Sequence, residues 1–248
     1  MKSAMRSELR LKHKLCNAFT LLETMLVIGI VAILVSLLLP SLQQARSSAD
    51  ELKNQAEIRS LAKSMNVYLT DNRGYYPALV PVGASSSTYY VGGVPYTIEG
   101  YFGQVYVWQF GLAEQYYGGQ VEGDIFRRAR REPWLVTDYR YSASFLADPA
   151  FWNYSSRTGP DQWRGQKASN VRYPSAKVLL ADDRIMAGAA TGAQAGVIAL
   201  TDGSAQFIAR SDIADPFPPG EGEWPGSLTF GRPGIHTVDG IFGRDIQP

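Results

Sequence analysis

An uninterrupted apolar run from Phe19 to Leu39 dominates the hydrophobic pattern of the chain. The run contains 21 residues and one ionisable side chain, Glu23. As a helix it would be about 31 Å long, close to the roughly 30 Å hydrocarbon thickness of a bilayer. The sequence therefore predicts one transmembrane helix over residues 19–39.

The residues before this run indicate its orientation. Residues 1–18 hold five lysines and arginines against one glutamate. Because positive flanks stay on the cytoplasmic side, we expect a cytoplasmic N-terminus and a periplasmic location for the chain beyond Leu39. A cleaved secretory signal peptide is the alternative. It fits less well, because the run is longer than the usual apolar region and no Ala-x-Ala-like site follows it.

After Pro40 the pattern becomes amphipathic. Apolar residues recur mostly every three or four positions from Leu42 to Leu69, as on one face of a helix. This predicts a helix that continues to about Leu69 and ends at residues 71–74, with a kink at Pro40, which lacks an amide donor. A generic coiled coil is the alternative for this segment.

The rest of the chain has the pattern of short strands. The segments STYYVGG, VPYTI and QVYVWQF predict short strands or ordered loops, and residues 112–117 predict a short helix that ends at Gly118 and Gly119. The many tyrosines and tryptophans here either pack a core or form a carbohydrate-stacking surface.

A clearer β pattern follows towards the C-terminus. Residues 176–181 predict a buried strand. Residues 196–201 and 204–209 predict a hairpin around Asp202 and Gly203, with the two positive-φ positions of a type I′ turn. The tail from Asp215 to Pro248 predicts loop. The chain as a whole is expected to have an α+β fold, with a long N-terminal helix packed on a small, mostly antiparallel sheet with aromatic-rich loops.

Composition narrows the possible functions. Hydrophobic residues make up 45% of the chain and the net charge is +1, so the chain is expected to fold and global charge gives no argument for nucleic acid as partner. The single cysteine, Cys16, excludes an internal disulfide or a cysteine-ligated metal site. Asp182 and Asp183 are adjacent on a predicted strand and should point to opposite faces. We predict no catalytic residues, no enzymatic activity and no metal site.

At the N-terminus the residues carry a family resemblance. A small residue, then FTLLE, then an apolar run that ends in LLLPSLQQAR, resembles the start of type IV pilins and of type II secretion pseudopilins. The resemblance implies that prepilin peptidase cuts between Ala18 and Phe19 and that the new N-terminus of Phe19 is methylated. Pro40 matches the proline often found where the helix leaves the bilayer. Ala18 departs from the glycine that the family usually has before the cut.

The resemblance also gives a role to Glu23. A carboxylate inside hydrocarbon costs roughly 2.5–3.5 kcal/mol, and more if it stays charged without a partner. In the family's logic, the freed amine of Phe19, from a neighbouring or the same subunit, pairs with this carboxylate and sets the register of assembly. The alternative is a glutamate that is merely tolerated at the membrane edge.

A second resemblance lies near the C-terminus. PSAKVLLADDR followed by VIALTDGSAQFI resembles the large pilin-like proteins of planctomycete- and verrucomicrobium-type bacteria. Those sequences usually have a histidine before the strand that ends in Asp-Gly, and this chain has none there, so no role is carried over. Since some pseudopilins bind calcium in a C-terminal loop, calcium remains open as the one cofactor.

Together these observations predict three parts: a leader over residues 1–18, a long helix over 19–72 and a β-rich extracytoplasmic domain over 73–248. The expected function is that of a pseudopilin or minor pilin, held in the inner membrane and polymerised into a type II secretion pseudopilus or a type IV pilus-like filament. Its expected partners are other pilin-like subunits, the prepilin peptidase, the assembly platform and membrane lipid. The alternative is a membrane-anchored ligand binder, for glycans for example, that does not polymerise.

Overall fold

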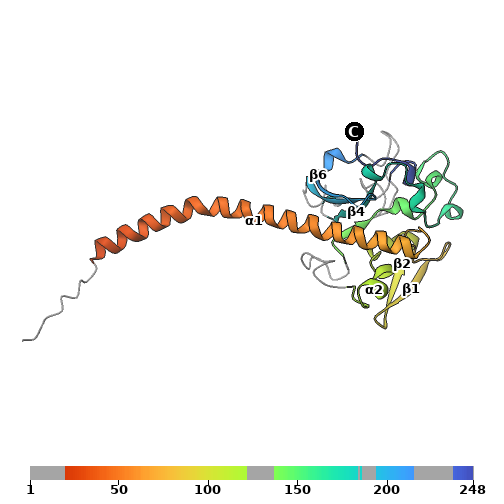
Figure 1. The fold of residues 1–248 in the computed structure, drawn as a ribbon, viewed down its shortest axis with the longest axis horizontal. Coiled ribbons are helices and arrows are strands. Elements are labelled where there is room, and N and C mark those ends of the chain that lie inside the picture. Colours follow the sequence, from red (N-terminus) through yellow and green to blue (C-terminus); the bar gives the residue numbers. More distant parts are fainter. Residues whose placement is uncertain (1–19, 122–136, 184, 186–193, 215–236, 248) are drawn as a thin grey trace, which may run out of the picture. The chain divides into compact units, whose positions relative to one another are not determined.

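The computed structural model describes residues 20–121, 137–183, 185, 194–214 and 237–247 (Figure 1). Ala18, Phe19 and the tail residues 215–236 lie outside this part of the chain. The chain forms two compact units, residues 1–49 and 50–248, which are described in turn. The elements are a long helix, a short helix and two antiparallel sheets, so the α+β prediction is confirmed.

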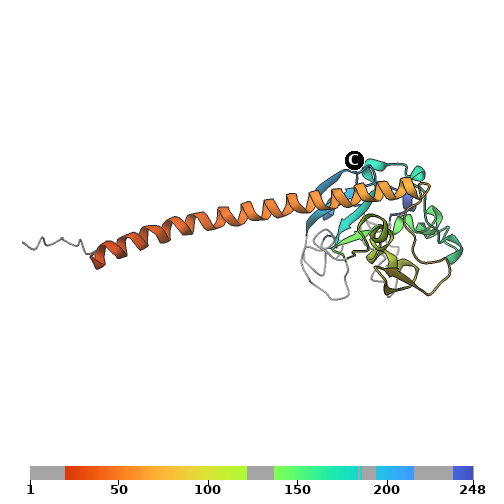
Figure 2. The same ribbon diagram turned by 60° about the horizontal axis from the view of Figure 1, so that its bottom comes forward.

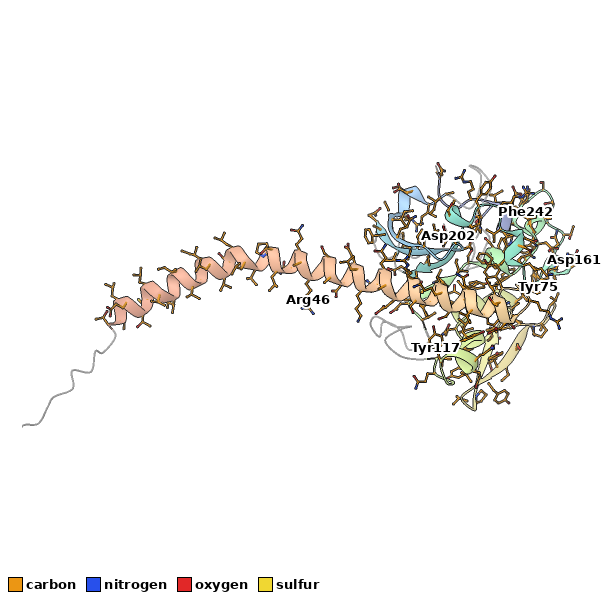
Figure 3. The ribbon with its side chains drawn as sticks, in the orientation of Figure 1. Arg46, Tyr75, Tyr117, Asp161, Asp202 and Phe242 are labelled. Carbon is orange, nitrogen blue, oxygen red and sulfur yellow. The ribbon has the colours of Figure 1, made fainter. Side chains whose placement is uncertain are left out.

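The long helix α1 spans Leu21–Asp71 and continues through Pro40 without interruption. Its part in the first unit is exposed throughout, and its apolar side chains project on all sides (Figure 3). By length and composition, α1 is the one described helix that could cross a membrane. A helix that is apolar all round suits a lipid surrounding, which agrees with the predicted span.

The last part of α1 belongs to the second unit and has one buried stripe. The buried apolar residues are spaced by three or four positions: Ile58, Leu61, Ala62, Met65 and Leu69. The helix ends where the sequence predicts. Arg73 and Gly74 adopt positive φ, and the amide of Gly74 donates to the carbonyl of Leu69 at 2.7 Å, which satisfies one of the last free carbonyls.

The stripe belongs to the same hydrophobic core as a four-stranded antiparallel sheet. The strand order is β3 (Tyr139–Tyr141), β4 (Val178–Asp182), β5 (Ala195–Leu200) and β6 (Ala205–Ala209). Every residue of the central strand β4 is buried. β4 begins two residues later than predicted, because Pro174–Ala176 form a 3₁₀ turn. The carbonyl of Ala176 then accepts the amide of Asp245 from the tail at 2.8 Å.

The turn between β5 and β6 differs from the prediction. The hairpin itself is present, and Asp202 is labelled in its turn in Figure 3. Of the two predicted turn residues, Asp202 and Gly203, only Gly203 has positive φ, at 85°. The amide of Gly203 donates to the carbonyl of Leu200, and the amide of Leu200 to the carbonyl of Ser204. This is a three-residue loop in which Gly203 forms a bulge, not a type I′ turn. The Asp202 carboxylate also accepts the amide and the hydroxyl of Ser204, which favours this loop.

A type I′-like turn occurs instead in the small second sheet. Strands β1 (Ser86–Val91) and β2 (Val94–Glu99) are joined by Gly92 and Gly93, both with positive φ. The helix α2 (Phe110–Tyr116) starts two residues before the predicted position and ends, as predicted, at Gly118 and Gly119. The segment QVYVWQF forms no strand: it lies partly in the 3₁₀ helix Tyr101–Tyr106 and runs into α2.

Most of the large aromatic side chains pack the core. Tyr101 stacks on Trp163 with 5.0 Å between ring centroids, and Phe102 stacks on Phe151 at 5.5 Å. Trp152 meets both Phe102 and Phe151 edge to face. The rings of Tyr101, Phe102, Phe151 and Trp152 are buried. Core packing, rather than a binding surface, therefore accounts for these aromatic residues.

Candidate functional site

The start of α1 holds a reciprocal hydrogen-bonded pair of Thr20 and Glu23. The Glu23 amide donates to Thr20 Oγ1 at 3.2 Å, and the Thr20 amide donates to Glu23 Oε2 at 2.9 Å. The Thr20 hydroxyl also donates to Glu23 Oε2, at 2.9 Å. This is the capping box of a helix N-terminus, in which two amides that have no helical partner are satisfied.

The pair explains how a carboxylate can sit at the end of an apolar run. The carboxylate accepts two hydrogen bonds from Thr20, which offset part of the cost of removing it from water. Both bonds end on Oε2, and no donor among the described residues reaches Oε1. Sequence reasoning singled out Glu23 but missed the capping role of Thr20. The signal was there, because Thr-x-x-Glu before an apolar run is the sequence signature of a capping box.

The other residues singled out in the sequence lie elsewhere. Pro40 lies within α1 in the first unit, and Asp202 and Gly203 form the β5–β6 turn of the second unit. Ala18 and Phe19 lie outside the described residues, so their expected cleavage and methylation stay predictions. Asp183 pairs with Arg140 and Asp182 is buried. Within the described residues, no group of three or more His, Cys, Asp or Glu side chains could hold a metal ion.

Sequence reasoning also missed a buried polar cluster that binds the tail to the sheet. Lys177 is fully buried, and its ammonium lies 3.2 Å from Asp245 Oδ2. It donates to Ser144 Oγ at 3.1 Å, to the carbonyl of Gly240 at 2.8 Å and to the Thr237 hydroxyl. Asp245 also accepts the Val178 amide at 2.8 Å. The tail was predicted to be loop, but its end lies inside the fold.

Burial dominates the electrostatics of this cluster. It lowers the pKa of the Lys177 ammonium, because desolvation disfavours the charged form, while Asp245 acts in the opposite direction. The cluster contains one ammonium ion surrounded by a carboxylate, two hydroxyl groups and a carbonyl. Every one of these oxygens gains a donor. The cluster therefore serves to hold the C-terminal segment in place.

Comparison with known proteins finds proteins that are similar to the first part of the chain. It is 41% identical over 59 residues to the type II secretion system core protein G of Aeromonas hydrophila, which is 24% of this chain and 41% of that protein. The same protein of Escherichia coli K12 is 40% identical over 59 residues. The major component of the type IV wide pilus of Thermus thermophilus is 36% identical over 74 residues, which is 29% of this chain and 56% of that protein.

These matches lie in the N-terminal region, where the Thr20–Glu23 pair and the apolar part of α1 are found. The N-terminal region is pilin-like. The chain spans about half the length, or less, of the relatives it matches. No family profile matches the chain, and no solved structure matches it. The similarity to pilin-type proteins therefore concerns the N-terminal region, and the β-rich part of the second unit is described from its structure alone.

Proposed function

We propose that this protein is a pilin-like structural subunit that is cleaved between Ala18 and Phe19, methylated at Phe19 and polymerised into a pseudopilus or pilus-like filament. The observation that carries the proposal is the capping box of Thr20 and Glu23, directly after the expected cut and at the start of a helix whose first part is apolar and exposed. The similarity of this region to a secretion pseudopilin and a pilus component supports the same conclusion.

The proposed assembly step follows from the free oxygen of Glu23. Cleavage creates a primary amine on Phe19, and in lipid an amine and a carboxylate attract each other strongly because little water screens them. The Thr20 hydrogen bonds hold the Glu23 side chain in one position, so that Oε1 is presented to the amine of an incoming subunit. The pair would then fix the axial position of each added subunit.

The proposed topology follows from charge and length. The basic residues 1–18 stay in the cytoplasm, residues 19–39 cross the inner membrane, and residues 73–248 form the periplasmic domain. The proposed partners are pilin-like subunits, the prepilin peptidase, the assembly platform and lipid. The rival proposal of a membrane-anchored ligand binder has less support, because the rings of Tyr101, Phe102, Phe151 and Trp152 are buried in the core.

Processing is the first test. In the native host, intact-mass analysis should find a chain that begins at a methylated Phe19. Ala18→Glu should stop cleavage, because a charged side chain cannot enter a pocket for a small residue, whereas Ala18→Gly should leave cleavage intact. A protein that keeps Met1, or one cut after Leu39, would contradict the proposal.

A further inference from the structure

The outer edge of β6 has main-chain groups without partners. Two hydrogen bonds lie at the two ends of the β5–β6 ladder: one from Leu200 N to Ser204 O and one from Arg210 N to Gln194 O. In an antiparallel pair with this register, Gln206 and Ile208 bond to β5, and the N–H and C=O of Phe207 point away from it. Among the described residues, nothing accepts or donates at Phe207, so this edge is open.

Proteins usually protect such an edge with charge, proline or a covering segment. β6 reads AQFIA and has neither a charged residue nor a proline. The Phe207 side chain is 48% exposed. A cavity of about 490 Å³ lies along the strand, lined among others by Phe207, Asp212 and Ile246. Gln55 covers only the Ala205 end, where its Nε2 donates to the carbonyl of Ala205 at 2.7 Å. The edge can therefore admit another strand.

The second sheet has an open edge of the same kind on β1. Val91 and Val94 flank the two-residue turn, and the amide of Gly100 donates to the carbonyl of Ser85. The residues that point away from β2 are therefore Ser86, Thr88 and Tyr90. All three are exposed, and β1 has no charge and no proline.

The opposite edge of this sheet is protected. On β2 the outward-pointing positions include Pro95, which has no amide, and Glu99, which is charged. Among the described residues, β1 and β6 are thus edge strands without a charge or a proline. β1 and β6 also lie on opposite sides of the second unit in both views (Figures 1 and 2).

We propose that the β6 edge of one subunit pairs with the β1 edge of a second copy, with Phe207 opposite Thr88. Both edges supply the unpaired N–H and C=O groups that the other needs, and pairing would cover the exposed rings of Phe207 and Tyr90. Because the two edges differ and lie on opposite sides, each added copy leaves one edge of each kind free. Such head-to-tail contacts build an open filament and not a closed dimer. This inference rests on the proposed function.

The test uses cysteine cross-linking in the full chain in its native host. In a Cys16→Ser background, Thr88→Cys and Phe207→Cys are combined in one chain, and a short bismaleimide is added to assembled protein. The expected result is a ladder at multiples of the subunit mass. Thr97→Cys with Phe207→Cys is the matched control, because Thr97 lies directly opposite Thr88 on the protected strand β2. It should give no ladder.

A mixture of two single-cysteine chains tests the direction of pairing. Co-expressed Thr88→Cys and Phe207→Cys chains should give cross-linked pairs, and neither chain alone should give any. A Phe207→Cys chain that cross-links to itself would overturn the head-to-tail arrangement. In addition, Phe207→Pro and Phe207→Lys should both abolish the filaments. The Phe207 amide is not bonded to β5, so both variants should still melt cooperatively.

The outcomes separate this inference from the proposed function. Filaments that form normally without a ladder, or that survive Phe207→Pro, would overturn strand pairing and leave the filament subunit standing. A parent chain that forms no filament would contradict the proposed function, and strand pairing between subunits would fall with it.

Discussion

At the scale of single residues, Lys177 shows how much one buried charge can hold in place. Lys177→Met removes the ammonium but leaves the Asp245 carboxylate inside the fold. Breaking one member of a buried pair costs about 3–5 kcal/mol, so the free energy of unfolding in detergent should fall by about that amount. The Arg164 side chain, which pairs with Asp148, is 62% exposed and screened by water, so Arg164→Gln should lower the free energy of unfolding far less than Lys177→Met.

The same residue should leave a signature in the pH dependence of stability. Burial lowers the pKa of Lys177 in the folded state, so between this value and the ordinary lysine pKa of about 10.4 the unfolded chain binds more protons. Stability rises with pH wherever that holds. The free energy of unfolding, compared with that of Lys177→Met, should therefore increase towards about pH 10. If the difference in the free energy of unfolding between the wild type and Lys177→Met stays constant or decreases over this pH range, Lys177 is not buried as described.

At the scale of elements, α1 consists of two parts with different surroundings. Residues 21–49 are exposed, and the buried stripe lies between residues 54 and 69. Deleting residues 1–40 removes the predicted membrane span and leaves the whole stripe. The fragment 41–248 should therefore be soluble and folded, with a cooperative thermal transition.

A longer deletion is the control for this division. Deleting residues 1–71 also removes Leu61 and Met65, which are fully buried, and the fragment should aggregate or lose its cooperative transition. If the 41–248 fragment aggregates as well, the boundary at Pro40 is wrong.

Elements with a strong local signal could be predicted from the sequence. The long helix, its stop at residues 71–74 and the β5–β6 hairpin follow from periodicity and from glycine positions. The turn type did not follow, because Asp-Gly fits both a two-residue and a three-residue loop. The Ser204 hydrogen bonds to Asp202 accompany the longer one.

At the scale of the whole molecule, prediction failed where contacts join distant parts of the chain. Lys177 reads as a polar residue near a strand, and only the fold brings Thr237, Gly240 and Asp245 to it. The candidate site was easier to predict from the sequence. Glu23 was found because a lone carboxylate in an apolar run is costly, and Thr20 could have been found from its spacing. The proposed assembly contact joins two chains, so neither the sequence nor the structure of one chain contains it directly.

The most direct test of the central claim compares two substitutions at the start of α1. Glu23→Gln removes the charge but keeps a side chain that can cap the helix, because Gln also serves in a capping box. Thr20→Ala removes the cap, at a cost of about 0.5–2 kcal/mol, but keeps the charge. If Glu23 pairs with the Phe19 amine of another subunit, Glu23→Gln should abolish filaments or secretion, while membrane insertion and the mass of the mature chain stay unchanged. Thr20→Ala should only weaken assembly. Normal filaments from Glu23→Gln would contradict the account.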